Sequence, residues 1–81
     1  MILEVQLFAA ARDLAGASPV EMELADCATV ADLRSRLVET HPNLESIANV
    51  LLVAINSEYA ADDRQLSDSD VVACFPPVSG G

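Results

Sequence analysis

The chain has 81 residues, 52% of them hydrophobic, and its 13 Asp and Glu residues against 4 Lys and Arg residues give a formal net charge of −9 at pH 7. This length predicts one small domain, and the hydrophobic content excludes an intrinsically disordered chain. The negative charge argues against nucleic acid and anionic membranes as partners. It favours a protein partner with a basic docking face.

No segment of the sequence is typical of membrane insertion or export. The longest apolar run, residues 50–55, is far shorter than the ~20 residues that span a bilayer. The first residues have neither the basic start nor the small-residue cleavage pattern of a signal peptide. We therefore expect a soluble, cytoplasmic protein.

In the first part of the chain, the side-chain pattern predicts two strands with a short helix between them. Residues 2–8 predict a strand in which Leu3, Val5 and Leu7 share one face, while Ile2, Glu4, Gln6 and Phe8 share the other. Residues 9–15 are helix-prone, and Gly16 fits the position that closes a helix. Residues 20–24 alternate apolar and acidic side chains, which predicts a strand with one wet face. We expect these two strands to pair antiparallel.

The middle of the chain predicts the main helix. Thr29 and Asp32 form a variant capping box, with Asp in place of Glu or Gln. The apolar side chains that follow recur at helical spacing, and they are Val30, Leu33 and Leu37. We expect an exposed ion pair between Asp32 and Arg36. The helix should end near Thr40, because the proline two positions further on disfavours helical backbone in the residue before it.

The second part of the chain predicts two more strands. Residues 50–55 form a continuous apolar run, which predicts a strand buried on both faces. Residues 56–69 are polar and turn-rich, and residues 71–75 form a last short strand. Two strands, one main helix and two further strands indicate an α+β fold in which the helix covers one face of the sheet.

Residues able to perform catalysis or bind metal are few. His41 is the single histidine, and we interpret it as a helix-terminal or solvated residue, because no partner nucleophile or carboxylate is evident. Cys27 and Cys74 lack C-x-x-C spacing, and we interpret both as small buried side chains. The acidic residues lack the spacing of metal ligands, so no metal site is expected. The absence of lysine removes Schiff-base chemistry and any internal isopeptide acceptor.

The last six residues, 76–81, have a different character from the domain that residues 1–75 are expected to form. Two prolines favour an extended course, and Gly80 and Gly81 would let the backbone enter a narrow channel. At the extended-chain limit the segment reaches roughly 20 Å beyond Phe75. A terminal carboxylate is ionised at neutral pH and is a poor electrophile. It becomes reactive only when a partner activates it, for example as an acyl-adenylate.

Three stretches carry a resemblance to a known family. They are residues 8–13 (Phe-Ala-Ala-Ala-Arg-Asp), residues 66–72 (Leu-Ser-Asp-Ser-Asp-Val-Val) and residues 75–81 (Phe-Pro-Pro-Val-Ser-Gly-Gly). With them, essentially the whole chain resembles the small, sulfur-carrying subunit of molybdopterin synthase, the MoaD family. The resemblance implies a ubiquitin-like β-grasp fold, a mixed sheet covered by one main helix. The family often has glycine where Ser69 stands, so we expect that turn to be built a little differently here, without an effect on the chemistry.

The resemblance implies a sulfur-transfer cycle. An ATP-dependent enzyme similar to the ubiquitin-activating class would adenylate Gly81, and a sulfur donor protein would convert the adenylate to a thiocarboxylate. The tail would then enter the large synthase subunit, where the sulfur builds the dithiolene of molybdopterin. The catalytic groups of that step are expected on the large subunit, and no cofactor is expected on this chain.

A docking surface is also implied by the resemblance. The family uses a hydrophobic patch at positions that match Phe8, Tyr59 and Phe75. Phe8 shares strand parity with polar residues, which makes it a candidate docking residue, although a place at the core edge stays open. Arg12 is expected either to pair with an acidic residue of a partner or to cap the short helix. The tail completes the expected partner-binding set with Pro76, Pro77, Val78 and Ser79.

Three other functions stay open. A sulfur carrier for thiamine or amino-acid sulfur would share the Gly-Gly end, although thiamine carriers are usually shorter and lack the Phe-Pro-Pro stretch. A ubiquitin-like modifier would form isopeptide bonds with lysines of target proteins. A plain binding module would have an inert tail.

Overall fold

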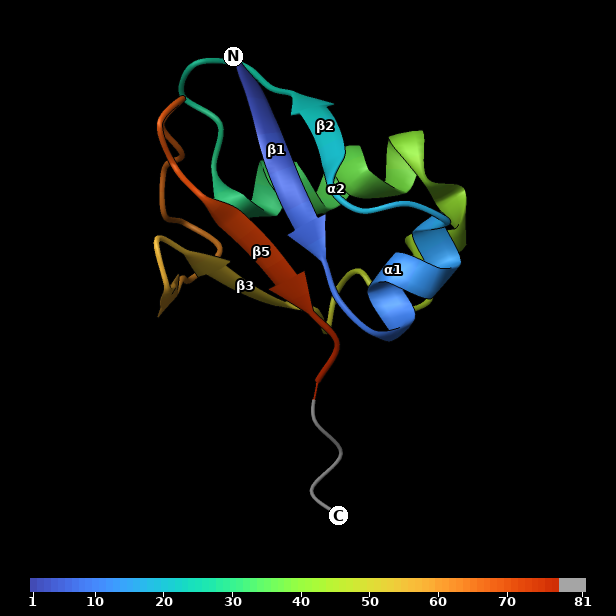
Figure 1. Ribbon diagram of the computed structural model, residues 1–81. Coiled ribbons are helices and arrows are strands. Elements are labelled where there is room, and N and C mark those ends of the chain that lie inside the picture. Colours follow the sequence, from blue (N-terminus) through green and yellow to red (C-terminus); the bar gives the residue numbers. More distant parts are fainter. Residues whose placement is uncertain (78–81) are drawn as a thin grey trace.

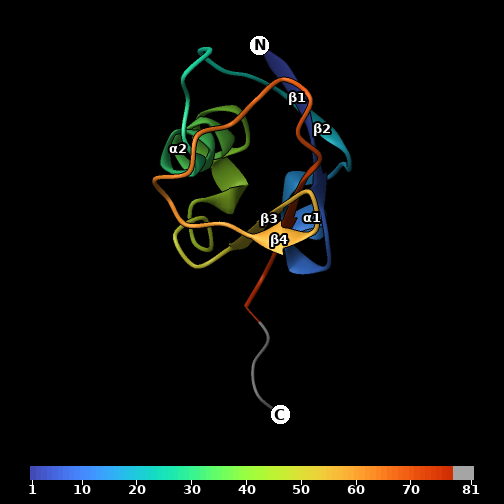
Figure 2. The ribbon, with the colours of Figure 1, turned by 90° about the vertical axis from the view of Figure 1, so that its left-hand side faces the viewer.

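The computed structural model describes residues 1–77 as one mixed sheet with the main helix across one face (Figures 1 and 2). Its elements are β1 (Ile2–Leu7), α1 (Ala10–Ala15), β2 (Val20–Glu23), α2 (Val30–Thr40), the 3-10 turn η1 (Pro42–Leu44), β3 (Leu52–Ile55), β4 (Glu58–Tyr59) and β5 (Val72–Phe75). The strand order is β2-β1-β5-β3-β4. The first and last strands, β1 and β5, run parallel in the middle, and the other pairs are antiparallel. The predicted α+β fold is confirmed.

The core lies between the sheet and α2. Alternate side chains of the strands point toward the helix, and the helix presents its apolar stripe to them. The buried set from these elements is Leu3, Val5, Leu7, Val20, Met22, Val30, Leu33, Leu37, Val53, Ile55, Val72 and Cys74. The faces predicted for the first two strands and the main helix are thereby confirmed. Full burial of each large apolar side chain contributes about 1.5–3 kcal/mol to stability.

Gly16 ends α1 as predicted. Its φ of 79° lies in the left-handed region, and its N–H donates to the carbonyl of Arg12 at 2.9 Å. No heavy atom lies within 4 Å of the position that a Cβ would take. The requirement for glycine here therefore comes from the backbone conformation alone.

The capping box predicted for α2 is present. The Thr29 side chain accepts a hydrogen bond from the Asp32 N–H at 3.4 Å, and an Asp32 carboxylate oxygen accepts from the Thr29 N–H at 2.9 Å. The helix ends at Thr40, as expected. The predicted ion pair between Asp32 and Arg36 is wrong. Asp32 turns back to the cap, and Arg36 pairs instead with Glu39 at 3.0 Å.

The interpretation of residues 50–55 as a strand buried on both faces is also wrong. Val53 and Ile55 of β3 are buried against the helix layer, whereas Val50 is 53% exposed and Leu52 is 38% exposed. A sheet of this kind has only one helix layer, so the other face of β3 is open to solvent. We call this uncovered side of the sheet, opposite α2, the open face.

A two-residue strand, β4, lies within the stretch that the sequence analysis left as turns. Asn56 and Ser57 have φ values of 53° and 72°, which fits a two-residue hairpin turn. The hairpin places Tyr59 opposite Ala54 of β3. Since Ala54 and Leu52 share one side of β3, the register directs Tyr59 to the open face.

A polar cluster holds the start of β5 against the β3–β4 hairpin. Asp70 accepts hydrogen bonds from Arg64 at 2.9 Å, from the Ser67 N–H at 2.8 Å and from Asn56 at 3.0 Å. The Asn56 side chain in turn accepts from the Val71 N–H at 2.9 Å. Hydrogen bonding to Arg64, followed by the Ser67 N–H, holds the pKa of the Asp70 carboxyl below its ordinary value of 3.8.

Arg34 of α2 also links separate segments of the chain. Its Nε lies 2.9 Å from a carboxylate oxygen of Asp62. One Nη donates to the carbonyls of Ala48 and Leu51, at 2.7 and 2.6 Å. These bonds tie α2 to the segment that enters β3 and to the loop that follows β4.

Among residues 1–77, no helix has the length and apolar character needed to cross a membrane.

Candidate docking site at the end of β5

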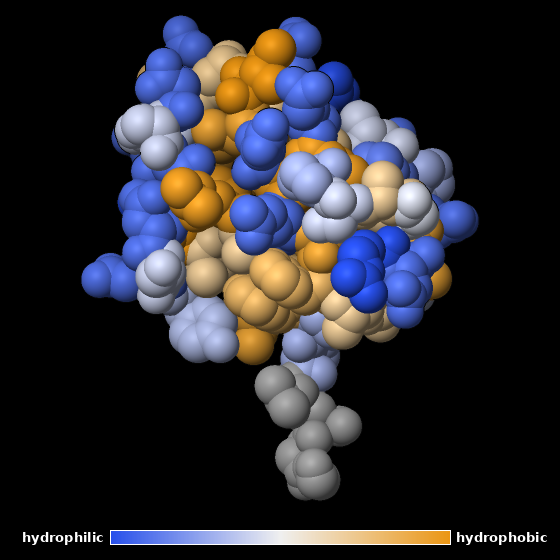
Figure 3. All heavy atoms as spheres, in the orientation of Figure 1, coloured by the Kyte–Doolittle hydropathy of each residue, from blue (hydrophilic) through white to orange (hydrophobic). Residues whose placement is uncertain are grey.

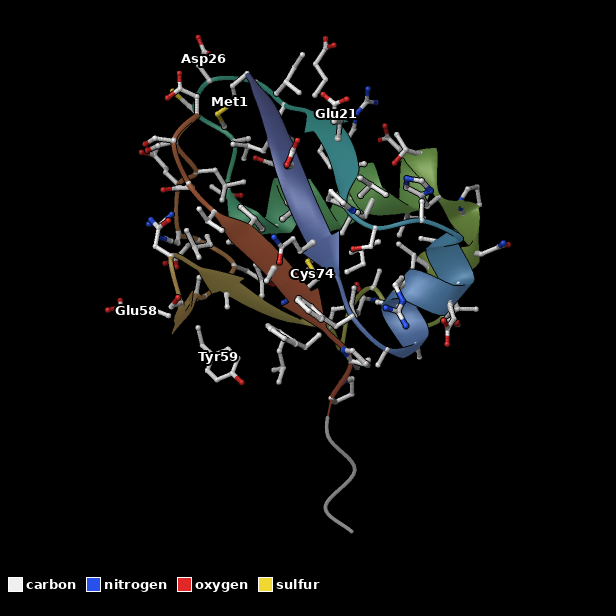
Figure 4. The ribbon with its side chains drawn as sticks, viewed as in Figure 1. Met1, Glu21, Asp26, Glu58, Tyr59 and Cys74 are labelled. Carbon is white, nitrogen blue, oxygen red and sulfur yellow. The ribbon has the colours of Figure 1, made fainter. Side chains whose placement is uncertain are left out.

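The C-terminal segment leaves the domain at one end of the sheet. The strand β5 ends at Phe75, and Pro76 and Pro77 continue beyond it. Because β1 and β5 are parallel, both strands end at this edge, and Met1 lies at the opposite end of the molecule (Figures 1 and 4). A partner that receives the tail therefore approaches this end of the domain.

Two phenylalanine rings stack where the two parallel strands end. The pairing of Leu7 with Cys74 puts the next residues, Phe8 and Phe75, side by side. Their ring centroids are 4.8 Å apart, and their planes differ by 7°. The Phe8 N–H also donates to the Cys74 carbonyl at 3.2 Å. Rings fixed in this way lose little further freedom when a partner binds them.

The stack forms one wall of an apolar hollow of about 370 Å³. The lining residues are Phe8, Ala9, Leu52, Tyr59, Phe75, Pro76 and Pro77. Tyr59 is 75% exposed and Phe8 38% exposed, so the walls stand open to solvent. Figure 4 shows Tyr59 at this end of the sheet, directed away from the domain. An open hollow with aromatic walls suits an apolar side chain of another protein.

Five residues predicted to bind a partner thus meet around one hollow, although they come from distant parts of the sequence. They are Phe8, Tyr59, Phe75, Pro76 and Pro77. Ala9 and Leu52 also line the hollow, although no sequence pattern predicted them as binding residues. Leu52 was hidden inside an apolar run, and only its register opposite Phe75 reveals its position. The tail residues predicted with them, Val78, Ser79, Gly80 and Gly81, lie outside the described residues.

Arg12 does not line the hollow. It lies on α1, where its carbonyl accepts the closing bond of the helix from Gly16. Its guanidinium forms no ion pair with any residue of the described part of the chain. The side chain is exposed and lies in the last turn of α1, so pairing with a partner and capping of the helix both stay predictions.

Side chains able to perform catalysis do not gather at the hollow. Cys74 is fully buried, and burial raises the pKa of its thiol to about 11, an effect that the charge of Arg34 only partly offsets. It is therefore a core thiol, as predicted, and a poor nucleophile at neutral pH. Cys27 is exposed in the loop before α2, so the prediction that it is buried is wrong. The pattern of residue types alone does not show which way a loop side chain turns.

The other predicted residues fit structural roles. His41 occupies the C-cap of α2, and its N–H donates to the Leu37 carbonyl at 2.7 Å. Within residues 1–77, no three His, Cys, Asp or Glu side chains are grouped so that they could hold a metal ion. The chemistry that these residues support is docking and presentation of the C-terminal segment.

Comparison of the chain with known proteins gives close relatives. The model of the ThiS family matches residues 5–81. The molybdopterin synthase sulfur carrier subunit of Chlamydomonas reinhardtii is 39% identical over 83 residues, and the match covers 100% of both chains. The crystal structure of SAMP1, small archaeal modifier protein 1, from Haloferax volcanii has a TM-score of 0.87 at 36% identity, again over 100% of both chains.

More distant structures show the fold. A complex of subunits 1 and 2 of the molybdopterin-converting factor from Helicobacter pylori matches with a TM-score of 0.69 at 23% identity, covering 100% of each chain. A Caldiarchaeum subterraneum ubiquitin matches with a TM-score of 0.60 at 18% identity, also over 100% of each chain. The expected ubiquitin-like β-grasp fold is confirmed. Since the family model covers nearly the whole chain and similarity to sulfur carrier subunits of molybdopterin synthase extends over its full length, the chain belongs to the ThiS family.

Proposed function

We propose that this protein is the sulfur carrier subunit of a molybdopterin synthase and presents sulfur as a thiocarboxylate on Gly81. The observation that carries the proposal is the apolar hollow around the Phe8–Phe75 stack, which lies where the C-terminal segment leaves the domain. A carrier needs a reactive end and a surface that positions this end in a partner. Relatives named as sulfur carrier subunits support the same function.

The first step is activation of the carboxylate. An adenylating enzyme joins the Gly81 carboxylate to the AMP part of ATP and releases pyrophosphate. A sulfide-level sulfur nucleophile (HS⁻) released by a donor protein then attacks the carbonyl carbon, the bond to AMP breaks and AMP leaves, and a thiocarboxylate remains. This chain supplies the carboxyl group and the docking surface, while ATP and the catalytic groups belong to the activating partner.

The second step is delivery to the large subunit. The hollow binds an apolar group of that subunit, and the tail extends from Pro76 and Pro77 toward its active site. The sulfur then goes into the dithiolene of molybdopterin. Support comes from the position of the hollow beside the tail and from the solved complex of two subunits in Helicobacter pylori.

Mass spectrometry of the intact chain tests the proposal. The chain is incubated with an adenylating enzyme, ATP and a sulfur donor, and the C-terminal peptide is then fragmented. We expect replacement of one oxygen by sulfur, localised to Gly81, because oxidation of methionine gives nearly the same mass change. A variant that lacks Gly81 is the control. It should keep its fold and melting temperature, since the buried core is formed by residues between Leu3 and Cys74, and it should lose sulfur transfer completely. Equal molybdopterin formation by the truncated chain would overturn the proposal.

A second candidate function is protein modification, which the similarity to small archaeal modifier protein 1 favours. In that function the activated Gly81 forms an isopeptide bond with a lysine of a target protein. It predicts covalent adducts of higher mass in cell extracts, sensitive to deletion of Gly81. The free chain together with one non-covalent partner would count against it. A carrier for another sulfur pathway would differ in the large protein that copurifies with the chain.

A further inference from the structure

The open face of the sheet has two unlike halves. The half beside the tail is apolar, with the hollow formed by β3, β4 and the ends of β1 and β5. The other half carries three glutamates, Glu4 on β1 and Glu21 and Glu23 on β2, which alternate with buried residues and so point away from α2. We call these three residues the acidic strip. Figure 3 shows hydrophobic residues gathered at the lower end of this face, whereas hydrophilic residues are interspersed with hydrophobic ones above. One exposed apolar side chain, Ile2, lies opposite Glu23 in the upper half.

The acidic strip is not explained by the stability of the fold. Glu4 lies directly opposite Glu21 in the antiparallel register, and like charges at such positions repel each other. None of the three glutamates forms an ion pair within residues 1–77.

The arginines of the chain do not neutralise the strip. Arg12 forms no ion pair within residues 1–77, and the other three arginines pair elsewhere. Arg34, Arg36 and Arg64 pair with Asp62, Glu39 and Asp70 respectively. Two of these partners lie in the loop that follows β4, and the third lies on α2. The strip therefore carries negative charge that the described structure leaves uncompensated.

We infer that the open face is one docking surface for a basic protein partner, whose apolar group enters the hollow while its arginine or lysine residues contact the acidic strip. The inference rests on the proposed function, because it assigns the docking partner of the same site. The unpaired negative charge of the acidic strip and its place on the same face as the hollow support it. A second copy of the chain does not fit, since two chains of net charge −9 repel each other.

The two halves define the spacing that the partner must match. Glu4 of β1 precedes Phe8, the residue just after the strand, by four positions, which corresponds to about 13 Å of extended chain. Figure 4 places Glu21 at the end of the sheet far from Tyr59. A partner held only at the hollow can rotate around it, whereas a second, charged contact fixes its orientation and so directs the tail. The negative field also raises the rate of encounter with a basic surface.

Association kinetics test the inference. The probe is the recombinant large subunit of molybdopterin synthase, and the test variant is E21Q/E23Q, which removes two charges far from the hollow. The matched control is E45Q/D63N, which removes two exposed charges outside the open face. We expect the test variant to associate about fivefold more slowly at low ionic strength, with a smaller effect at high salt. The control should associate within about twofold of the wild-type rate.

The outcomes separate the inference from the proposed function. Equal slowing by both variants, or no slowing by E21Q/E23Q, overturns the inference and leaves the carrier function intact. Failure of the wild-type chain to bind the large subunit overturns both.

A map of amide shift changes on binding gives an independent readout. We expect changes along β2 as well as around residues 52, 59 and 75, and changes confined to the hollow contradict the inference. Both double variants replace exposed side chains, and a thermal melt of each confirms that it is folded.

Discussion

The two faces of this sheet are built from the same strands but perform different work. On the face toward α2, side chains such as Val5 and Val53 are buried and hold the domain together. On the open face, Phe8, Leu52 and Tyr59 remain exposed although they are large and apolar. Because successive side chains of a strand point to opposite faces, residues that stabilise the fold alternate with residues that are available for docking. Substitutions on the two faces should therefore have separable effects.

The largest expected effect lies on the buried face. Leu33 in α2 is fully buried, and Leu33→Ala should lower the free energy of unfolding by about 3 kcal/mol, through lost burial and the cavity left behind. Urea denaturation measures this change. Tyr59→Ala on the open face is the comparison, since Tyr59 is 75% exposed, and it should change stability by no more than about 0.5 kcal/mol. Comparable losses in the two variants would contradict the separation of the faces.

The open face should show the opposite pattern. Phe8→Ala removes half of the aromatic stack, and we expect the dissociation constant for the large subunit to rise by about 30-fold, the effect of losing a central aromatic contact. Titration calorimetry measures the affinity. Leu14→Ala is a matched control, because Leu14 is 37% exposed and Phe8 38%, yet Leu14 lies outside the hollow. Equal losses in both variants would show that the hollow has no special role.

A smaller effect is expected from acid acting on the polar cluster at the start of β5. Because the folded-state pKa of Asp70 lies below its ordinary 3.8, the folded chain takes up this proton at lower pH than the unfolded chain does. The stabilisation that ionised Asp70 contributes to the fold is present at neutral pH and is lost as the pH falls through the folded-state pKa. Asp70→Asn should lower the melting temperature at pH 7 by about 5 °C.

The control for that substitution is a series of melting temperatures measured at decreasing pH. The difference between wild type and Asp70→Asn should narrow below pH 3.8, the ordinary pKa of an aspartate. A difference that is constant down to pH 2 would show that the charge of Asp70 contributes nothing. Partner affinity at neutral pH should change little, since Asp70 does not line the hollow.

Local patterns were enough to predict much of the fold. The period-2 alternation in residues 2–8 and 20–24 and the stripe Val30, Leu33 and Leu37 predicted which side chains are buried, because each element packs against one layer. The Thr29 capping box and Gly16 predicted element ends, since both act through hydrogen bonds and backbone geometry within a few residues. These are local effects, and the sequence contains them directly.

Long-range pairing decided what the sequence left open or predicted wrongly. The apolar run 50–55 cannot reveal that no second layer covers β3, so Leu52 was expected to be buried and is exposed. Cys27 was predicted buried because its residue type is common in cores, but it is exposed in the loop before α2. Asp32 was predicted to pair with Arg36, but its carboxylate accepts the Thr29 N–H of the helix cap instead.

The sequence by itself determined the helices, most of the strands and the chemical character of the C-terminal segment, because these depend on residue types and short spacings. Only the tertiary structure decided how the docking site is assembled. The parallel pairing of β1 with β5 joins residues separated by most of the chain and stacks Phe8 on Phe75. The antiparallel registers of β3 then add Leu52 and Tyr59 to the same hollow. Such contacts arise from the packing of the whole sheet on α2, and no local pattern encodes them.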